Sequence, residues 1–484
     1  MLLVGLLQVA ATDLSRQSSP DSVRAAADPS RQSSPDPSRA ETDAIPVGAG
    51  VEGRPAPDHT SPLQAAVDRA QPGDRVTVPA GTYNGDLYID RPITLSGVGR
   101  PILLGSGTGS VVRVRSAGVV IEGFDIDGGG SGDLGRDTSG IHIAAPHATV
   151  RDCRVRGALF GIYLRESDDA VVEGNIITGI PGRAPGEMGS GIHVWNSQRF
   201  RLVGNTIVGT RDGFYIQSSS HGLVRGNRAS DLRYGLHYMF SDDNVFEDNV
   251  FERGAAGAAL MYSHRLTFRR NRFVHNRGFA SVGLLLKACD DVMAEDNLIA
   301  DNARGIFLEG SYRNQFRRNV VAMSDMALVI YDSSGGNLFE GNVFIGNLTP
   351  LSLSGKRTDT RFDGNYWSDH GDPDLDGDGI SDRPYRLSNV FDHVRGNLTA
   401  ADLFSRSIAA VALGAAEQSF PVLDPIPVVD AHPLARPPVL AAVPAEAAGP
   451  SRSVAGMVPP LGLLLVGGGM LMVGGRSWVK GQPS

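Results

Sequence analysis

The residues best suited to chemistry are two methionines and three histidines in the middle of the chain. Met239 and Met261 stand 22 positions apart, His237 lies two residues before Met239, and His264 and His193 lie further out on either side. Thioether sulfur and imidazole nitrogen are soft to borderline ligands that suit Cu(I) and bind Mg²⁺ or Ca²⁺ poorly. We therefore predict a transient copper site formed by these five residues.

A second group of potential ligands is the acidic run that follows Trp367. Five aspartates alternate with glycines and other small spacers in the order D-x-D-x-D-G-D-G-x-x-D: Asp372, Asp374, Asp376, Asp378 and Asp382. Oxygen ligands at alternate positions, with glycines for a sharp turn, are what a calcium ion requires. The twelfth position is Arg383, not Glu, so the match to a helix-flanked calcium loop is incomplete. We predict a structural calcium site here, and an acidic solvated turn is the alternative.

The elements that position these residues are repeats of about 22 residues. Asparagines recur behind a short strand at 175, 205, 227, 249, 271, 297, 319, 342 and 365, and a second strand, such as GIYLRES at 161–167, begins eight residues after most of them. Such a period is typical of a solenoid in which each coil contacts only its neighbours. We predict an all-β fold, a right-handed parallel β-helix over residues 59–367. Asparagine suits the left-handed turns between strands, and stacked amides hydrogen-bond from coil to coil.

Alternation within the second strands places one set of side chains in the core and the other outside. Positions one and three after the glycine are nearly all aliphatic, whereas position two reads His142, Tyr163, His193, Tyr215, His237, Ala259. Position four includes Met239 and Met261, which become neighbours about 4.8 Å apart on adjacent coils. His193 and His237 are two coils apart, which argues against one compact site for both. An aromatic ladder that shields the sheet is the structural alternative.

These outward positions do not favour an enzyme. Polysaccharide hydrolases need two or three carboxylates that converge within several ångströms. Between residues 140 and 356, Glu309 is the one acid in the two outward positions, and the Asp-Asp pairs at 168–169, 242–243 and 290–291 follow strands, where Asp favours turns. Insertions at 128–138, 181–188 and 275–279 loop out of the repeat and are the places where binding surfaces tend to form.

Composition and charge exclude other partners. The net charge of −8, with basic and acidic residues interspersed, leaves no basic field for nucleic acid. Cys153 occupies the asparagine position of an early coil, about five coils from Cys289, so the repeat predicts two free thiols that fill the core.

The two ends of the chain predict export and anchoring. Residues 1–11 are apolar and end in V-A-A, like the core of a signal peptide, and residues 13–58 repeat S-R-Q-S-S-P-D in a background that cannot form a core. Residues 454–475 carry no charge and precede Arg476 and Lys480, which predicts a transmembrane anchor with the body outside the cytoplasm. We thus divide the chain into a signal-like segment and disordered leader (1–58), the β-helix (59–367), an acidic loop, helix and Pro-rich cap (368–445) and the anchor (454–475).

Two motifs near the C-terminus resemble a known family. The run GNYWSD…GD.D.DGDG..D.PY (364–385), followed by DLFSRSIAAVALGAAE and FPVLDPIPVVDAHPL, is similar to the NosD family of periplasmic β-helix proteins of nitrous-oxide reductase maturation. The resemblance covers roughly residues 60–438. It implies a non-catalytic protein that works with the membrane and ATPase subunits of an ABC transporter and a copper chaperone, with nitrous-oxide reductase as client, in the periplasm. It does not identify copper ligands.

Two functions therefore stay open. The first is an accessory role in copper-site assembly, and the second is calcium-dependent polysaccharide binding or modification by a β-helix lyase, hydrolase or epimerase. The β-helix repeat suits both, whereas the C-terminal motifs favour the first.

Overall fold

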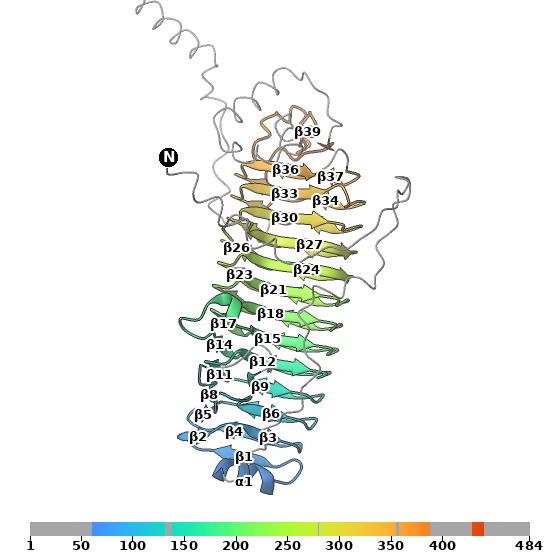
Figure 1. The fold of residues 1–484 in the computed structure, drawn as a ribbon. Coiled ribbons are helices and arrows are strands. Elements are labelled where there is room, and N and C mark those ends of the chain that lie inside the picture. The colour runs from blue at the N-terminus through green and yellow to red at the C-terminus, as the bar shows by residue number, and fades with distance from the viewer. Residues whose placement is uncertain (1–60, 131–137, 279, 355–357, 388–427, 440–484) are drawn as a thin grey trace, which may run out of the picture. The chain divides into compact units, whose positions relative to one another are not determined.

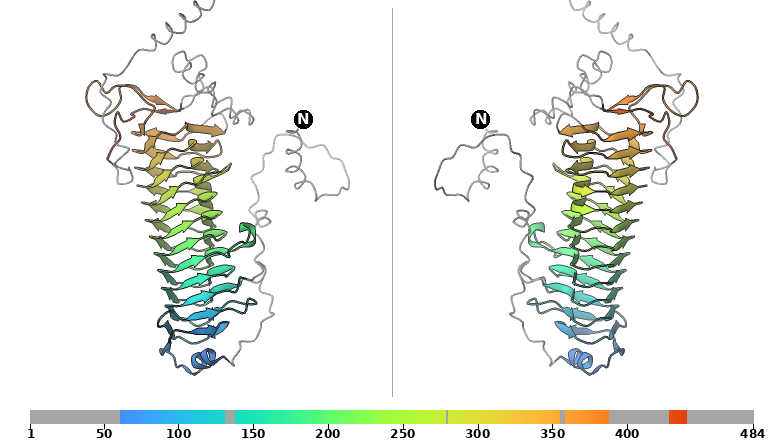
Figure 2. Two further views of the ribbon diagram at one scale, coloured as in Figure 1. Left: turned by 90° about the vertical axis from the view of Figure 1, so that its left-hand side faces the viewer. Right: turned by 90° about the vertical axis from the view of Figure 1, so that its right-hand side faces the viewer.

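The computed structural model describes residues 61–130, 138–278, 280–354, 358–387 and 428–439, and these form a parallel β-helix (Figure 1). Successive coils stack into a column, and the side views in Figure 2 show the sheets running along it. The predicted fold class is confirmed. The predicted leader, the helix expected near 398–420 and the anchor at 454–475 lie outside the described residues. No helix within the described ranges is long and apolar enough to cross a membrane.

Each coil contributes one strand to each of three sheets. In the described residues the first sheet contains 15 strands: β1 (Arg75–Val78), β4 (Thr94–Gly97), β7 (Val120–Glu122), β10 (Thr149–Arg151), β13 (Val171–Glu173), β16 (Arg201–Val203), β19 (Leu223–Arg225), β22 (Val245–Glu247), β25 (Thr267–Arg269), β28 (Met293–Glu295), β31 (Gln315–Arg317), β34 (Leu338–Glu340), β37 (Arg361–Asp363), β40 (Val429–Asp430) and β39 (Tyr385–Arg386).

The second sheet follows directly after the asparagines of the repeat. Its 13 strands in the described ranges are β2 (Thr82–Asn84), β5 (Ile102–Leu104), β8 (Asp125–Asp127), β11 (Arg154–Arg156), β14 (Ile176–Thr178), β17 (Thr206–Val208), β20 (Arg228–Ser230), β23 (Val250–Glu252), β26 (Arg272–Val274), β29 (Leu298–Ala300), β32 (Val320–Ala322), β35 (Val343–Ile345) and β38 (Tyr366–Trp367). This strand was not predicted, since the sequence indicated two strands per coil.

The third sheet carries the candidate copper ligands. Its 12 strands in the described part of the chain are β3 (Leu87–Ile89), β6 (Val112–Val114), β9 (Ser139–Ile143), β12 (Phe160–Arg165), β15 (Ser190–Trp195), β18 (Asp212–Gln217), β21 (Tyr234–Met239), β24 (Ala256–His264), β27 (Val282–Asp290), β30 (Arg304–Glu309), β33 (Met326–Tyr331) and β36 (Thr349–Ser354). Neighbouring strands are parallel and mostly 22 residues apart, with a step of 30 between β12 and β15 and of 26 between β24 and β27. The insertion at 181–188 contains a short 3-10 helix, η3 (Pro185–Glu187).

Aliphatic and phenylalanine side chains from all three sheets fill the narrow core. In β12 the alternate residues Ile162 and Leu164 are completely buried, as the repeat predicted. Rings stack along the column from coil to coil, as Phe246 does on Phe268 with centroids 4.5 Å apart. Because a single coil buries so few side chains, each coil depends on its neighbours for a closed core.

An asparagine ladder runs along the inside of the column. The amide of Asn175 donates to Oδ1 of Asn205 at 3.0 Å, Asn205 donates in the same way to Asn227, and each Oδ1 also accepts the backbone N–H of the previous asparagine. The predicted amide stacking is therefore confirmed. The expectation that these asparagines adopt the left-handed conformation is wrong, because the preceding residue does so, for example Gly204 (φ 63°) and Asp248 (φ 57°). That turn is what directs the amide into the core.

The two cysteines are free and buried, as predicted. Cys153 donates its backbone N–H to Asn175 in the asparagine ladder, and Cys289 lies in register with Ser263 in a parallel ladder of serines. Burial raises the pKa of each thiol to about 12, which keeps both protonated and unreactive.

The helix α1 (Pro62–Arg69) covers the first coil and was not predicted. It begins with a proline at its first position and buries Leu63, Gln64 and Val67. At the other end of the column, Asp430 of β40 takes the place of the next asparagine and accepts hydrogen bonds from Asn365 and from the indole of Trp367. Both ends of the core are thereby closed.

Candidate metal centre

Met239 and Met261 lie side by side on the outer face of the third sheet. They are register partners in β21 and β24, and each is half-buried. His237 lies two residues before Met239 on the same face, and its register partner in the next coil is Ala259. The repeat thus brings two thioethers and one imidazole onto one small area of two adjacent coils, as predicted.

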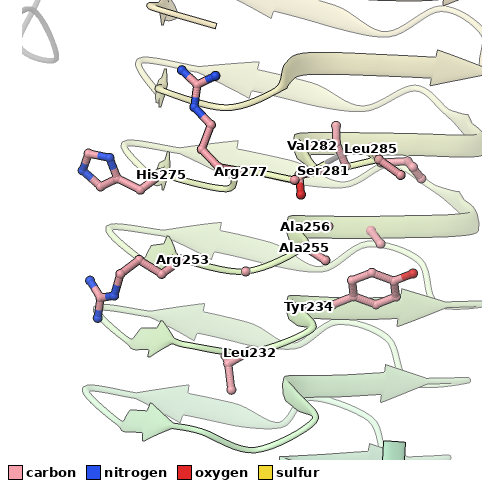
Figure 3. Close-up of a pocket in the computed structure, with 14 residues that line it drawn as sticks. Leu232, Tyr234, Arg253, Ala255, Ala256, His275, Arg277, Ser281, Val282 and Leu285 are labelled. Atoms are coloured by element: carbon pink, nitrogen blue, oxygen red, sulfur yellow. The ribbon is translucent and has the colours of Figure 1, made fainter. Parts of the chain in front are cut away.

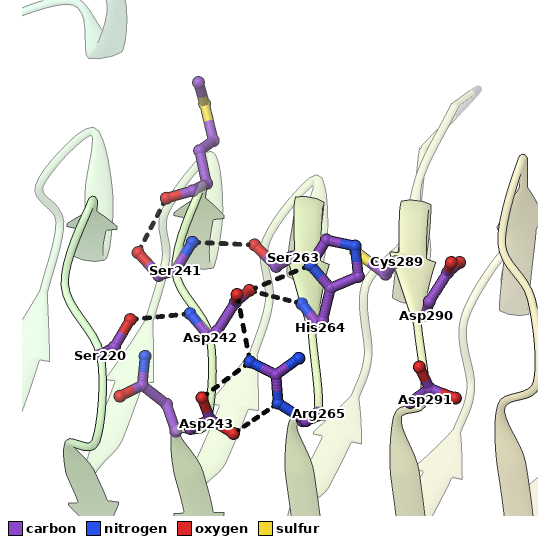
Figure 4. Close-up of polar contacts among 12 residues, drawn as sticks. Ser220, Ser241, Asp242, Asp243, Ser263, His264, Arg265, Cys289, Asp290 and Asp291 are labelled. Atoms are coloured by element: carbon purple, nitrogen blue, oxygen red, sulfur yellow. Dashed lines mark hydrogen bonds and ion pairs between the residues drawn. The ribbon is translucent and has the colours of Figure 1, made fainter.

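The other two histidines are placed apart from this group. Between His193 and His237 stands Tyr215, with ring centroids 4.5 and 4.7 Å from the two imidazoles, so the two histidines are two coils apart as expected. His264 follows the turn after Met261 and binds Asp242 instead: its Nδ1 lies 3.2 Å from Oδ1 and its backbone N–H donates to the same carboxylate (Figure 4).

The outward histidines and tyrosines form a continuous stack, but they are less exposed than the alternation predicted. Centroids of successive rings lie 4.4 to 5.0 Å apart from His142 through Tyr163 to His193. Tyr163 is 1% and His193 7% exposed, and Ala259 is also buried, so the expectation that this position faces solvent is wrong for these residues. The rings shield one another along the column, which the alternation of one strand could not reveal.

Buried imidazoles in this stack are neutral. Burial lowers the pKa of His193 to about 3 and that of His142 to about 4. His193 Nδ1 lies 3.1 Å from the hydroxyl of Ser190, whereas the Nε2 atoms of both histidines are buried without a hydrogen-bond partner among the described residues.

A fully buried carboxylate that the sequence analysis missed contacts His237. Asp212 of β18 is 0% exposed, and its Oδ2 lies 3.2 Å from His237 Nδ1. Arg233 donates to both carboxylate oxygens, at 2.8 and 2.6 Å. Burial alone would raise the pKa of Asp212, but the hydrogen bonds from His237 and Arg233 outweigh it and lower the pKa to about 2. The sequence offers one signal for this residue: an acid stands directly before Gly213, at the first position of the strand.

Two exposed aromatic rings flank the methionines. Phe240 and Tyr262 directly follow Met239 and Met261, stack with centroids 5.1 Å apart, and are 41% and 40% exposed. Both adopt the left-handed conformation, with φ of 50° and 53°, which is unfavourable for bulky residues. The methionine pair therefore lies in a small exposed apolar area.

A cavity of about 660 Å³ opens beside the N-terminal ends of β21, β24 and β27 (Figure 3). Its floor contains Ala256, Ala259 and Val282, and Tyr234 closes the side next to His237, with ring centroids 5.3 Å apart. The small side chains of one coil, together with the insertion after His275, produce this hollow. The rim includes Arg253 and Arg277, whose guanidinium groups pair with Asp231 and with Asp301 and Asp325 respectively.

The acidic loop brings together three of its five aspartates. Asp374, Asp376 and Asp378 offer oxygens within 4.8 Å of one another. They also accept backbone N–H groups of their own loop, as Asp374 does from Gly377 and Gly379. Asp382 instead accepts the N–H of Leu375, and Asp372 lies 3.9 Å from His370. The calcium site stays a prediction.

The fold and the candidate site belong to a parallel β-helix scaffold with two thioethers and an imidazole close together on one outer face. A family model described as "Periplasmic copper-binding protein (NosD)" matches residues 180–372. Proteins named "Probable ABC transporter binding protein NosD" from Stutzerimonas stutzeri and Pseudomonas aeruginosa are each 30% identical, over 72% and 75% of this chain and 84% and 88% of their own lengths. The chain belongs to the NosD family.

The resemblance found in the C-terminal motifs is thus confirmed. Among solved structures, the N-terminal fragment of gene product 12 of bacteriophage Phi29 matches with a TM-score of 0.50 and 13% identity over 63% of each chain. This likeness concerns the β-helix alone.

Proposed function

We propose that this chain is a non-catalytic periplasmic accessory protein that carries copper transiently during assembly of a copper site. The observation that supports it most is the register of Met239 with Met261, which places two thioethers on adjacent coils beside His237. The description of the family as periplasmic and copper-binding supports the metal and the compartment.

The donor set suits Cu(I) as cargo. Two thioethers and one imidazole match the ligand preference of a soft monovalent cation, and the half-buried positions allow it to enter and leave. Phe240 and Tyr262, which directly follow the two methionines, stack on each other and are exposed. Three donors on an open face favour transfer over storage, because a partner can supply a further ligand.

The partners follow from the family. Its relatives are named as ABC transporter binding proteins, so we propose that this chain works with the membrane and ATPase subunits of such a transporter. The family resemblance extends the proposal to a copper chaperone as donor and nitrous-oxide reductase as client. The outer face around Met239 and Met261 is the proposed place of exchange.

Anaerobic titration of the purified chain with Cu(I) against a chromophoric chelator tests the site. We expect sub-micromolar binding of one Cu(I). The affinity should fall at least about tenfold in Met239→Ala/Met261→Ala, since this double variant removes both soft sulfur ligands. The matched control is Met293→Ala/Met323→Ala, because Met293 lies in the first sheet and Met323, 60% exposed, follows the second. Equal affinity of the two double variants and the wild type would refute this site.

The polysaccharide alternative predicts a different outcome. A glycan-binding or glycan-modifying protein would bind or degrade acidic polysaccharides in the presence of Ca²⁺ and would bind Cu(I) no better than the methionine variant does. Screening binding of alginate and pectate with and without Ca²⁺ separates the two functions and also tests the predicted aspartate loop.

A further inference from the structure

We infer that Asp212 is a positioning residue for the metal site: it holds His237 through Nδ1 so that Nε2 is the nitrogen offered to the metal. This inference rests on the proposed function, because it assigns a role to a residue that supports one of the proposed ligands. It adds a second layer of residues, Asp212 and Arg233, to the site.

The contacts of Asp212 come from its own coil and the next one. Oδ2 lies 3.2 Å from His237 Nδ1, 2.6 Å from Arg233 Nη2 and 3.4 Å from Arg211 Nε, and Oδ1 accepts from Arg233 Nε at 2.8 Å. The guanidinium of Arg233 therefore binds both oxygens of the carboxylate. This arrangement fixes the carboxylate and leaves Oδ2 directed at the imidazole.

Stacking of the coils does not require a carboxylate at this place. The positions in register with Asp212 in the following coils are Tyr234, Ala256 and Val282, so neutral and apolar side chains serve equally well there. Burying a charged pair gives little or no net stability compared with apolar residues of the same volume. A fully buried aspartate at this position is better explained by what it does to His237.

Nδ1 of His237 faces a full negative charge, so it carries the proton when the imidazole is neutral. The lone pair then resides on Nε2, which is the usual arrangement of a metal-binding histidine whose other nitrogen donates to a carboxylate. Arg233 Nη2 also lies 3.3 Å from Nδ1, and a bond from it would require an unprotonated Nδ1. We assign the proton to Nδ1 because the fully charged carboxylate lies at 3.2 Å and accepts, whereas Arg233 already binds both oxygens of that carboxylate.

Two tyrosines and the carboxylate of Asp212 hold the imidazole. The rings of Tyr215 and Tyr234 meet it nearly edge to face, at 87° and 82°, and restrict its rotation. In the next coil the register partner of His237 is Ala259, so the stack of rings ends at this imidazole. The imidazole is therefore held by Tyr215, Tyr234 and Asp212.

The neighbouring coil offers an internal comparison. Ser190 occupies the register position of Asp212 one coil earlier, and its hydroxyl lies 3.1 Å from Nδ1 of His193. There the imidazole is buried and has no methionine beside it, since Trp195 and Gln217 occupy the corresponding outward positions. A charged partner thus occurs at the histidine that stands next to the methionine pair.

Nitrogen NMR of the ¹⁵N-histidine-labelled full chain tests the inference directly. Two-bond ¹H–¹⁵N correlations distinguish protonated from unprotonated ring nitrogens, and His237→Ala assigns the signals of this residue. We expect protonated Nδ1 and unprotonated Nε2 for His237 in the metal-free protein, with Nε2 shifting when Cu(I) or Ag(I) is added. A protonated Nε2 in the metal-free wild type would overturn the inference.

Neutral replacements of the aspartate supply the second test. Asp212→Asn, and Asp212→Asn/Arg233→Gln, which also removes the guanidinium bound to both carboxylate oxygens, should mix the two tautomers and weaken Cu(I) binding about 10- to 100-fold. The matched control is Asp231→Asn, which breaks the equivalent two-point pair with Arg253 at a half-exposed position and should change neither.

The outcomes separate the two proposals. If the wild type binds no Cu(I), the proposed function fails, whereas the tautomer can still be read in the metal-free protein. If His237→Ala weakens Cu(I) binding but the Asp212 variants leave both affinity and tautomer unchanged, only the role of Asp212 is overturned.

Discussion

At the scale of single residues, five histidines in the described part of the chain are held through Nδ1. Nδ1 contacts a hydroxyl or carboxylate oxygen within 3.2 Å in each of these pairs: His193–Ser190, His237–Asp212, His264–Asp242, His275–Asp301 and His432–Asp363. A histidine fixed in this way offers Nε2 in a defined direction. The chemistry of the outer face therefore depends on residues that are not themselves ligands.

The buried histidine His193 makes stability depend on pH. Its pKa is about 3 in the folded protein, mainly because burial penalises the charged imidazole, with Arg211 adding to the effect. The unfolded chain takes up a proton near pH 6.5, so this contribution to stability is complete above pH 6.5 and is lost as the pH falls towards 3. At pH 5 the loss from this residue is about 2 kcal/mol.

Urea unfolding of the wild type and of His193→Phe at pH 7.5 and pH 5 measures this contribution. We expect the wild type to lose about 2 kcal/mol more than the variant between the two pH values, because Phe keeps the ring stack without a titrating group. Replacement of the exposed His147 is the control. Parallel losses in all three proteins would show that His193 does not titrate in this way.

At the scale of the elements, the regular spacing of the asparagines made the arrangement of the coils predictable from the sequence. The spacing of the asparagines predicted the coil length, the insertions and the pairing of Met239 with Met261, since a fixed period determines which residues become neighbours. Asp212 could not be predicted in the same way. Its partners depend on side chains that reach across a coil boundary, and a period gives positions but not the direction of a carboxylate.

The burial of Tyr163 and His193 escaped prediction for a related reason. Alternation within a strand distinguishes the core side from the outer side, but exposure on the outer side depends on the size of the rings above and below. Strands of the second sheet, such as β14, follow the first-sheet strands after a turn of only two residues, so the sequence did not distinguish the two.

A substitution within the asparagine ladder should destabilise the protein strongly. Asn249 donates from Nδ2 to Val224 O and to Asn271 Oδ1, and its own Oδ1 accepts from Asn227. Asn249→Ala leaves these buried groups unsatisfied, so we expect a loss of about 3 kcal/mol in the free energy of unfolding. Urea titration followed by circular dichroism measures it. Asn84→Ala, at an exposed position, should cost less than about 0.5 kcal/mol, and equal effects would contradict the ladder's role.

At the scale of the whole molecule, the two motifs that resemble the NosD family meet in one structural unit. Asn365 and Trp367 of GNYWSD donate hydrogen bonds to Asp430 of PVVDAHPL, 63 to 65 residues away in sequence. Asp430 is fully buried and ends the asparagine ladder, and Trp367 stacks on Tyr385 with centroids 4.8 Å apart. The two motifs together thus close the open end of the solenoid.

Removal of the Asp430 carboxylate should open this end and leave the middle intact. Asp430→Ala removes the acceptor for the backbone of Gly364 and Asn365 and for the Trp367 indole, so amides at 361–368 and 428–434 should exchange at least about tenfold faster. Hydrogen–deuterium exchange with mass spectrometry resolves these peptides. Asp430→Asn keeps one acceptor oxygen and should have a smaller effect. Faster exchange throughout the column would instead indicate that the cap and the coils unfold together.

The central claim is that copper binds between two adjacent coils through Met239, Met261 and His237. X-ray absorption spectroscopy of the Cu(I)-loaded chain measures this most directly, because sulfur and nitrogen scatterers are distinguished by their distances from the metal. We expect two sulfur ligands and one nitrogen ligand, with both sulfurs lost in Met239→Ala/Met261→Ala. A shell of nitrogen and oxygen alone, or a sulfur shell that survives in the double variant, would contradict it.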